Sequence, residues 1–531
     1  MNRTDGSLKL LSDHLTVGAM LRPDHTALIY QGARISYQEF YEKVENLACY
    51  LLEIGIEKGD RISYILTPRP EFFYLYMAAS RIGAIIVGMS TRHTIHEMEY
   101  VINNSGASYI FSLDTMYDID YQARITDLYT KCPTLQGAVI VGEKANLANS
   151  LTINDILNKD FTYIKPQLEA REESLSTHDG LIIVYTSGST GTPKGALMSH
   201  QNIIHMSMIE IAQCGADYQD IWLNHLPVNH VSGATEIGAT AIIANSTMVL
   251  AAFNPADALD LIQKEKITIL GQVPTMFAME FALENYDSYD LSSLKTVVIS
   301  GAPATMEILR KIVSTMTKNC YNCLGLTEVS GLITYTLPGA SLETLNETVG
   351  ICAPEFEMKL VDNDRNIVPT GDIGEIAYRG TSVIKEYYEL PEATAAAFDD
   401  EGWFYSGDLG VIDEDGMLRL VGRSKEIYIT GGFNVYPVEI EEQIMRYPKV
   451  LMTACIAIPN SILGEIGRAY VVPNPGETID IEALSRYLAE YLADYKLPRE
   501  YIVRDMLPLT LLGKIDKKAL RQELEAELKE K

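Results

Sequence analysis

The sequence predicts an α/β fold with a large first domain and a smaller second domain. Short apolar runs alternate with longer helical patterns from residue 26 to residue 300. Short alternating strands replace this rhythm from about residue 346 to residue 421, and a new mixed unit follows Arg423. A chain of 531 residues also exceeds the size at which a single hydrophobic core keeps growing, so at least two domains are expected.

The apolar runs of the first part have the length and composition of buried strands. They cover residues 26–30, 61–66, 84–89, 109–113, 137–142, 181–186, 247–253, 267–273 and 296–300. Between them lie segments such as residues 38–55, whose apolar positions recur at helical spacing and whose last residue, Gly55, suits a helix C-cap. This alternation is typical of an α/β domain.

Turn signals divide the region from 346 to 421 into short strands, which predicts a small β-rich subdomain. The unit after Arg423 reads as helix, strand, strand, helix, strand, helix, and Pro437 suits a first helical turn. We therefore expect the domains to span residues 1–424 and 425–531. Residues 516–531 mix charges of both signs at helical spacing and predict a solvated helix.

Composition and charge restrict the classes of function. The 43 Lys and Arg residues face 71 Asp and Glu residues, and the net charge of −28 argues against nucleic acid or anionic lipid as a partner. The sequence shows no signal peptide and no transmembrane segment, so a cytoplasmic location is expected. The seven cysteines suggest buried thiols; Cys320 and Cys323 have a metal-like spacing but lack a second pair or a nearby His.

The most informative segment runs from Tyr185 to Gly195 and follows an apolar strand. Its glycines can turn backbone N–H groups inward, its hydroxyl groups add donors, and Lys194 adds a positive charge, as a phosphate loop requires. Pro193 before Lys194 and Gly195 after it exclude the Walker pattern. A flexible Gly/Ser/Thr connector is the alternative interpretation of this segment alone.

Four further segments follow in order, namely Leu324 to Glu328, Tyr405 to Asp408, Gly422 to Glu441 and Pro508 to Lys514. Together with the phosphate loop they resemble the adenylate-forming superfamily, which includes acyl-CoA synthetases, adenylation domains of peptide synthetases and luciferases. The resemblance covers nearly the whole chain. It implies an N-terminal domain of two αβαβα-type subdomains with a small β-barrel-like subdomain, followed by a small mobile α+β lid domain.

The resemblance implies a nucleotide site whose residues come from all of these segments. The expected ATP- and AMP-binding residues are Thr186, Ser187, Gly188, Ser189, Thr190, Gly191, Lys194, Gly301, Ala302, Pro303, Asn322, Cys323, Leu324, Gly325, Thr327, Glu328, Asp408, Arg423 and Lys514. The expected catalytic residues are Lys514, Glu328, Thr186 and His230, with Glu328 as the ligand of Mg²⁺.

Each of these roles has a physical reason and a plainer alternative. The Asp408 carboxylate can accept hydrogen bonds from both ribose hydroxyls, but a turn Asp is equally simple. Lys514 can bring the attacking carboxylate and the α-phosphate together, but it lies near two other lysines and could be a surface residue. Glu328 could merely start a helix. Leu324 stands where the family usually has an aromatic residue that stacks on adenine.

The acyl site implied by the resemblance is lined by side chains that are mostly small or apolar, which suits an apolar acyl group or ring. Its expected residues are His230, Val231, Gly233, Val273, Ser300, Gly301, Gly325 and Leu326. His230 resembles the histidine that closes over the acyl pocket, although Asn229 replaces the usual aromatic residue before it. A hydrogen-bonded structural histidine is the alternative.

The resemblance also implies an acceptor site and a moving domain. Gly431 and Gly432 resemble the glycine-rich segment that lies at the pantetheine channel, and Lys425 resembles the residue about which the second domain rotates. The expected reaction consumes ATP with Mg²⁺, forms an acyl-adenylate from a carboxylic acid, and transfers the acyl group to coenzyme A. A carrier protein as acceptor, luciferase-type oxidation, a non-catalytic sensor and a homodimer stay open.

Overall fold

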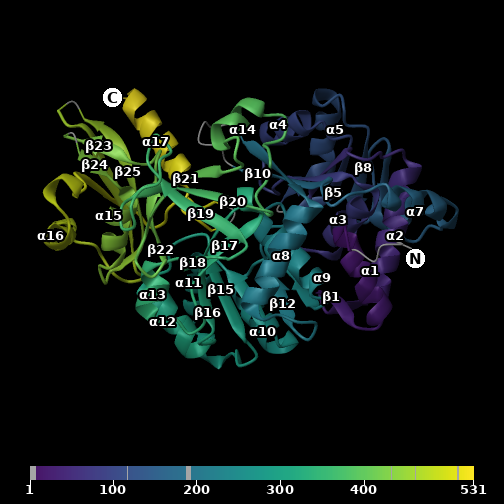
Figure 1. Cartoon of the computed structure of the whole chain (residues 1–531), viewed down its shortest axis with the longest axis horizontal. Coiled ribbons are helices and arrows are strands. Elements are labelled where there is room, and N and C mark those ends of the chain that lie inside the picture. The colour runs from purple at the N-terminus through teal and green to yellow at the C-terminus, as the bar shows by residue number, and fades with distance from the viewer. Residues whose placement is uncertain are drawn as a thin grey trace.

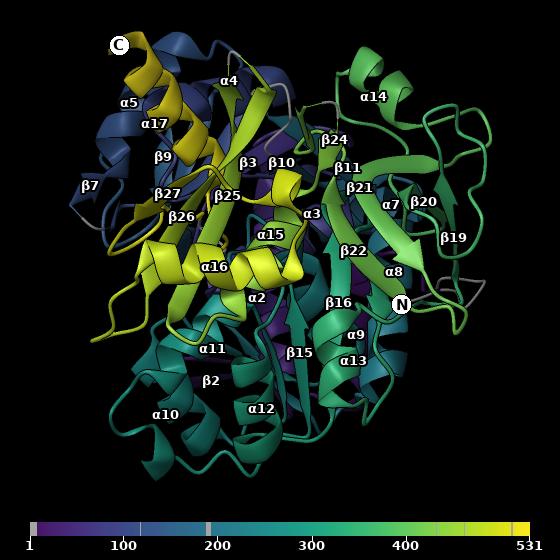
Figure 2. The same ribbon diagram turned by 90° about the vertical axis from the view of Figure 1, so that its left-hand side faces the viewer.

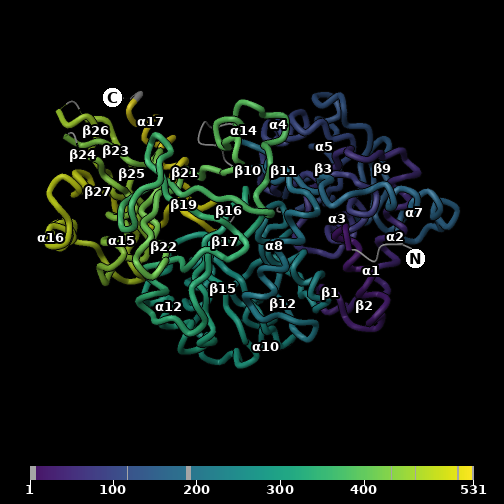
Figure 3. Tube along the Cα trace, viewed as in Figure 1, coloured from purple at the N-terminus to yellow at the C-terminus, as the bar shows by residue number. Residues whose placement is uncertain are grey.

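The structure is a computed structural model that describes residues 8–116, 118–186, 193–431, 433–460, 462–510 and 513–530. The described residues form a mixed α/β fold with a large N-terminal and a small C-terminal domain (Figures 1 and 3). The two central sheets of the large domain are mostly parallel, and the remaining sheets are mostly antiparallel.

The larger central sheet has nine strands within the described residues. In spatial order these are β18 (Ile351–Cys352), β17 (Gly331–Tyr335), β16 (Cys320–Leu326), β15 (Thr296–Ser300), β14 (Ile269–Gln272), β12 (Ile221–Asn224), β13 (Thr247–Leu250), β1 (Thr26–Tyr30) and β2 (Ala33–Ser36). Strands β12, β14, β15 and β16 run parallel, so their carboxyl ends meet at one edge of the sheet. That edge is where open α/β sheets bind their ligands.

The second central sheet has seven strands in the part of the chain that is described. They are β11 (Lys194–Ser199), β10 (Gly180–Thr186), β4 (Ile85–Gly88), β3 (Arg61–Ile65), β5 (Tyr109–Leu113), β8 (Gly137–Val141) and β9 (Ser150–Thr152). Every apolar run that predicted a strand contains one. These runs lack strict alternation because both faces of the sheet are covered by helices.

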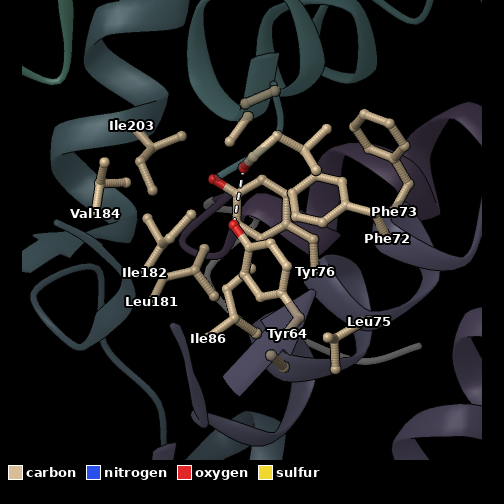
Figure 4. Packing of buried hydrophobic residues seen from close by; sticks show 14 of the residues in the cluster. Tyr64, Phe72, Phe73, Leu75, Tyr76, Ile86, Leu181, Ile182, Val184 and Ile203 are labelled. Carbon is tan, nitrogen blue, oxygen red and sulfur yellow. Dashed lines mark hydrogen bonds between the residues drawn. The ribbon is translucent and has the colours of Figure 1, made fainter. Parts of the chain in front are cut away.

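Helices cover and join the two central sheets. The helix predicted in residues 38–55 is α2 (Tyr37–Glu53), which begins with a capping box between Ser36 and Glu39 and is followed by Gly55 at a φ of +87°. It packs on α3 (Pro70–Ile82), and Phe72 and Tyr76 of α3 belong to the same buried aromatic and aliphatic cluster as Ile86 and Ile182 (Figure 4). Ser199 caps α8 (His200–Cys214), as expected.

The remaining elements of the large domain are short. They are α1 (Leu11–Leu21), α4 (Ile95–Ser105), a β6–β7 hairpin (Thr115–Met116 and Ile119–Asp120), α5 (Tyr121–Lys131), α6 (Ile153–Leu157), α7 (Lys165–Glu173), α9 (Thr240–Ile243), α10 (Pro255–Glu265), α11 (Pro274–Phe281), α12 (Met306–Thr315), α13 (Leu342–Glu347) and α14 (Pro391–Ala397). A π-helix, η2 (Ser232–Ala239), precedes α9, and a 3₁₀ turn, η4 (Thr327–Val329), follows β16.

The predicted β-rich subdomain is an antiparallel sheet. It consists of β19 (Phe356–Val361), β20 (Gly374–Gly380), β21 (Phe404–Ile412) and β22 (Leu418–Arg423). The register of β21 and β22 places Asp408 opposite Arg423. This antiparallel ladder thus brings together two of the residues that were expected at the nucleotide.

The C-terminal domain confirms the predicted order of elements and adds a hairpin before it. The hairpin is β23 (Tyr428–Thr430) and β24 (Phe433–Val435); α15 (Pro437–Met445), β25 (Val450–Asn460), β26 (Gly464–Pro473), α16 (Ile481–Tyr491), β27 (Glu500–Val503) and α17 (Lys517–Glu530) follow. Figure 2 shows α16 and β25 facing the viewer. The solvated interpretation of the last helix is wrong for one face, because Leu520 and Leu524 of α17 are buried against β25 and β26.

The boundary between residues 424 and 425 stays a prediction. All seven cysteines are free thiols. Within the described ranges, no group of His, Cys, Asp or Glu side chains could hold a metal ion by itself, and no helix is long and apolar enough to cross a membrane.

Candidate active site

Segments from distant parts of the chain meet at the carboxyl edge of the nine-stranded sheet. Val273, Gly301 and Thr327 follow the ends of β14, β15 and β16 directly. In the neighbouring sheet, β10 ends at Thr186 and β11 begins at Lys194, so the expected phosphate loop connects these two strands. Ser187, Gly188, Ser189, Thr190 and Gly191 lie outside the described residues.

Lys514 reaches this edge from the C-terminal domain. Its loop is closed by a hydrogen bond from Thr510 N to Lys514 O (2.7 Å), and Thr275 Oγ1 donates to the carbonyl of Gly513 (2.9 Å). A Cβ placed on Gly301 would lie 2.9 Å from Lys514 Cε, so the lysine tail fills the space that a side chain there would need. Burial, followed by the charge of Arg423, lowers the pKa of Lys514. Lys514 therefore lies inside the candidate site.

Asp408 and Arg423 form an ion pair at the rim of the same site. Arg423 Nε lies 2.8 Å from Asp408 Oδ1, and Asp408 is 6% exposed. Burial raises the pKa of Asp408, whereas the charge of Arg423 opposes this rise. The Asp408 charge in turn raises the pKa of Arg423. Lys514 interacts electrostatically with both residues, which places the three charges in one cluster.

Glu328 interacts electrostatically with Arg423 and Asp408 and has an aromatic partner. Tyr387 donates a hydrogen bond of 2.8 Å from its hydroxyl to Glu328 Oε1, and Lys194 Nζ lies 4.8 Å from the centroid of the same ring. The segment that carries Tyr387 is fixed by hydrogen bonds from Ile384 N to Glu328 O (2.9 Å) and from Tyr388 N to Gly195 O (2.7 Å). Burial raises the pKa of Glu328.

Three further residues expected at the nucleotide, Asn322, Cys323 and Leu324, have side chains in different surroundings. Asn322 donates both amide hydrogens to the carbonyls of Leu345 and Thr348, at 2.9 Å each, and Cys323 is buried in the core. The Asn322 side chain is thus used in internal hydrogen bonds, and the Cys323 side chain is used in core packing. Leu324 is half-buried, and its N–H donates to Thr334 Oγ1 over 3.2 Å.

The loop after β15 and the turn after β16 supply the remaining expected positions. Ala302 is half-buried and Pro303 is exposed beside Gly301, while Gly325 packs so closely on Gly331 that a Cβ there would lie 2.6 Å from the Gly331 carbonyl. Thr327 is buried in η4, directly before Glu328. These positions shape the backbone of the site.

His230 lies at the start of the segment that leads into η2. Its Nδ1 lies 3.0 Å from Ser232 Oγ, and burial, followed by the charge of Lys514, lowers its pKa to about 3. His230 is therefore neutral near pH 7 and within electrostatic reach of Lys514. Val231 and Gly233 are buried beside it, and Leu326 is half-buried at the end of β16.

A cavity that includes Ser300 is lined by acidic side chains that the sequence prediction missed. Ser300, one of the expected acyl-pocket residues, lines it together with Glu210, Trp222 and Glu236. Glu210 interrupts the apolar segment 203–211 and Glu236 interrupts the apolar segment 231–243. An ionisable residue inside an apolar run was the available signal for both. Tyr387 has no such signal, because only the fold brings it to Glu328.

The expected hinge and acceptor residues lie outside this cluster. Lys425 is exposed in the turn after β22, and Gly431, which is also exposed, follows β23 at a φ of +56°. Gly432 lies outside the described residues. Lys517 contacts Glu426 (3.0 Å) and Glu441 (2.8 Å), joining α17 to the segment that follows Lys425.

Comparison with known proteins identifies the family. Residues 16–388 match the AMP-binding enzyme family, and residues 439–514 match the AMP-binding enzyme C-terminal domain. YngI of Bacillus subtilis is 32% identical over 96% of this chain and 97% of its own length. The medium-chain fatty-acid–CoA ligase of Escherichia coli is 31% identical over 97% of this chain and 90% of its own length.

A solved structure agrees with this assignment. ATP-bound MatB of Rhodopseudomonas palustris is 27% identical, with a TM-score of 0.82 over 97% of this chain and 99% of that chain. The family matches cover the sheet edge and the Lys514 loop, and the Asp408–Arg423 pair lies between the two matched ranges. The chain belongs to the AMP-binding enzymes of the adenylate-forming superfamily, and its relatives are acyl-CoA synthetases.

Proposed function

We propose that the protein is an AMP-forming acid–thiol ligase that converts a carboxylic acid, ATP and coenzyme A into an acyl-CoA, AMP and pyrophosphate. The observation that carries this proposal is the position of Lys514, which lies in the gap left by Gly301 and beside the Asp408–Arg423 pair. A relative at 31% identity is named as a fatty-acid–CoA ligase, which supports the same reaction class.

In the first step the carboxylate of the acid attacks the α-phosphate of ATP, and pyrophosphate leaves. Two anions must approach each other, and the ammonium group of Lys514 offsets their repulsion inside a site of low dielectric constant. Asp408 accepts hydrogen bonds from the ribose hydroxyls, and Arg423 keeps that carboxylate ionised and oriented. Thr186, Lys194 and the loop between them bind the phosphates.

Glu328 fits the role of the Mg²⁺ ligand. Its carboxylate is a hard oxygen donor at the sheet edge, and its Oε1 is oriented by Tyr387. Since no described cluster of acidic or imidazole groups could hold a metal alone, phosphate oxygens of ATP would complete the coordination. A bound Mg²⁺ would neutralise charge on the departing pyrophosphate.

In the second step the thiol of coenzyme A attacks the acyl carbonyl, and AMP leaves. We infer that the C-terminal domain rotates about Lys425, which withdraws Lys514 and brings Gly431 and Gly432 to the site. The exposure of Gly431 supports a second arrangement, because the groups around Lys514 here are Arg423, Glu236 and Asp408. His230, neutral near pH 7, would border the acyl group in both steps.

Pyrophosphate release with a panel of carboxylic acids tests the proposal. Lys514→Ala should abolish pyrophosphate release but retain most of the thioester formation from a supplied acyl-adenylate. Lys518→Ala, which removes an exposed lysine of α17, is the matched control and should leave both half-reactions unchanged. Equal loss of both half-reactions in Lys514→Ala would contradict the assignment of Lys514.

A further inference from the structure

The cavity beside Ser300 has a volume of about 10 Å³, and its wall contains both polar and aliphatic side chains. Glu210 of α8 and Glu236 of η2 lie in its wall together with Trp222 of β12, while most of the remaining wall is aliphatic. The exposed fractions of Glu210, Trp222 and Glu236 are 3%, 2% and 8%. Two acidic side chains are thus removed from solvent in the wall of a cavity that also includes Ser300 of the expected acyl site.

These polar groups lack adequate partners inside the protein. Thr240 Oγ1 lies 3.5 Å from Glu210 Oε2, which is a long hydrogen bond. Across the described parts of the chain, Trp222 Nε1 has no acceptor, and no hydrogen bond to the Glu236 carboxylate is found. Burying a polar group without a partner destabilises the fold, so a group of this kind points to a ligand that completes it.

The two carboxyl groups interact with each other and with the reacting end of the site. Burial, followed by the charge of Glu236, raises the pKa of Glu210 well above its usual value. Burial raises the pKa of Glu236 to about 7, and Lys514 opposes this rise. Glu236 therefore lies within electrostatic reach of both Glu210 and Lys514. A cation beside the pair would favour the ionised form of either carboxyl group, which burial disfavours.

The chemistry of the wall discriminates between acids. A plain alkyl chain would leave the carboxyl groups and the indole N–H unpaired, and a second carboxylate would be repelled by the charge of the pair. A protonated amine can donate to both carboxyl groups and lie against the face of an indole ring. The polar residues of the cavity thus match a cationic nitrogen.

We propose that the acid activated by this enzyme carries a protonated amino group in its acyl part, which binds at Glu236, Glu210 and Trp222 while its carboxylate lies at Lys514. This inference rests on the proposed function and specifies its substrate class. Glu236 and Glu210 are specificity-determining residues in this arrangement, and they take no part in the transfer of the acyl group.

The test compares matched acids in the pyrophosphate-release assay with the full-length enzyme. Hexanoate, 6-aminohexanoate and adipate share one chain length, and shorter amino acids with their alkanoate counterparts extend the series. At least one amino acid should exceed its alkanoate counterpart in kcat/KM by tenfold or more. Preference for the alkanoate at every length overturns the inference but leaves the proposed function standing, whereas no pyrophosphate release with any acid overturns the proposed function.

Variants of Glu236 and Glu210 test whether these residues cause the preference for an amino acid. Glu236→Gln should lower kcat/KM for the preferred amino acid by ten- to a hundredfold, mainly through KM, and should leave the alkanoate unchanged or improved. Glu265→Gln, which changes a buried glutamate of α10 outside the cavity, should change neither value. Should Glu236→Gln fail to fold, Glu210→Gln takes its place with the same expectation. An equal change for amino acid and alkanoate overturns the inference.

Discussion

The hydroxyl of Tyr387 donates a 2.8 Å hydrogen bond to Oε1 of Glu328, and this bond joins the segment before α14 to the turn after β16. Lys194 lies against the same aromatic ring. The Tyr387 side chain therefore contacts both Glu328, through its hydroxyl group, and Lys194, through its ring. It can fix the carboxylate and shield the lysine at once.

Tyr387→Phe should weaken the use of Mg²⁺ and ATP. The variant keeps the ring beside Lys194 but removes a hydrogen bond to a charged group, which is worth roughly 1.5 to 3 kcal/mol. We expect kcat/KM for ATP to fall by about tenfold or more and the Mg²⁺ requirement to rise. Tyr37→Phe, which removes a buried hydroxyl bonded to Ser246 O, should leave both values unchanged. Equal losses in the two variants would argue against a role of Tyr387 at Glu328.

Gly301→Ala should impair adenylate formation selectively. Its added methyl group would meet Lys514 Cε at 2.9 Å, so the lysine could not keep its position. Pyrophosphate release should fall by more than tenfold, while thioester formation from a supplied acyl-adenylate should persist. Gly371→Ala is the control, because Gly371 has a similar φ (+91°, against +86°) but no heavy atom within 4 Å of its Cβ position. If both variants lose pyrophosphate release equally, backbone strain rather than the contact with Lys514 is the cause.

Leu324→Tyr should retain activity and leave the KM for ATP unchanged or lower. Leu324 is half-buried on β16 opposite Thr334, with its backbone N–H already bonded to Thr334 Oγ1. A tyrosine there adds an aromatic face without removing a side-chain hydrogen bond. The KM for ATP, measured at saturating acid, checks this expectation. A large loss of activity would show that position 324 does not adjoin the adenine.

Stability should fall as the pH rises from about 4.5 to about 7. Glu236 has an ordinary pKa of 4.5 when unfolded and a pKa of about 7 in the folded chain, where burial dominates and Glu210 and Lys514 face it. The unfolded chain therefore loses its proton first, and deprotonation favours unfolding over this range by roughly 3 kcal/mol. Glu236→Gln should lose less stability between pH 5 and pH 8 than the wild type, as measured by urea denaturation. Parallel losses would assign the effect to another group.

The sequence predicted those parts of the molecule that depend on local patterns. The apolar runs marked the strands, and the resemblance to the adenylate-forming superfamily implied a set of nucleotide-binding residues, of which Asp408, Arg423 and Lys514 do meet in the structure. Glu210 and Glu236 were missed because nothing local shows that a helix after β11 and a π-helix after β12 face one cavity. The prediction of a solvated α17 was wrong for one face, because the many charged residues of this helix obscured the two leucines that are buried.

The two ion pairs of Lys517 have a mechanical consequence. This lysine is the first residue of α17, three positions after Lys514, and it contacts Glu426, the neighbour of Lys425. Glu441, its second partner, accepts a hydrogen bond of 2.6 Å from Cys455 N in β25. The loop that carries Lys514 is thus clamped to the base of its own domain at the point where the proposed rotation begins. Because these ion pairs join the start of α17 to the residue after Lys425, a rotation at Lys425 would move Lys514 together with the rest of its domain.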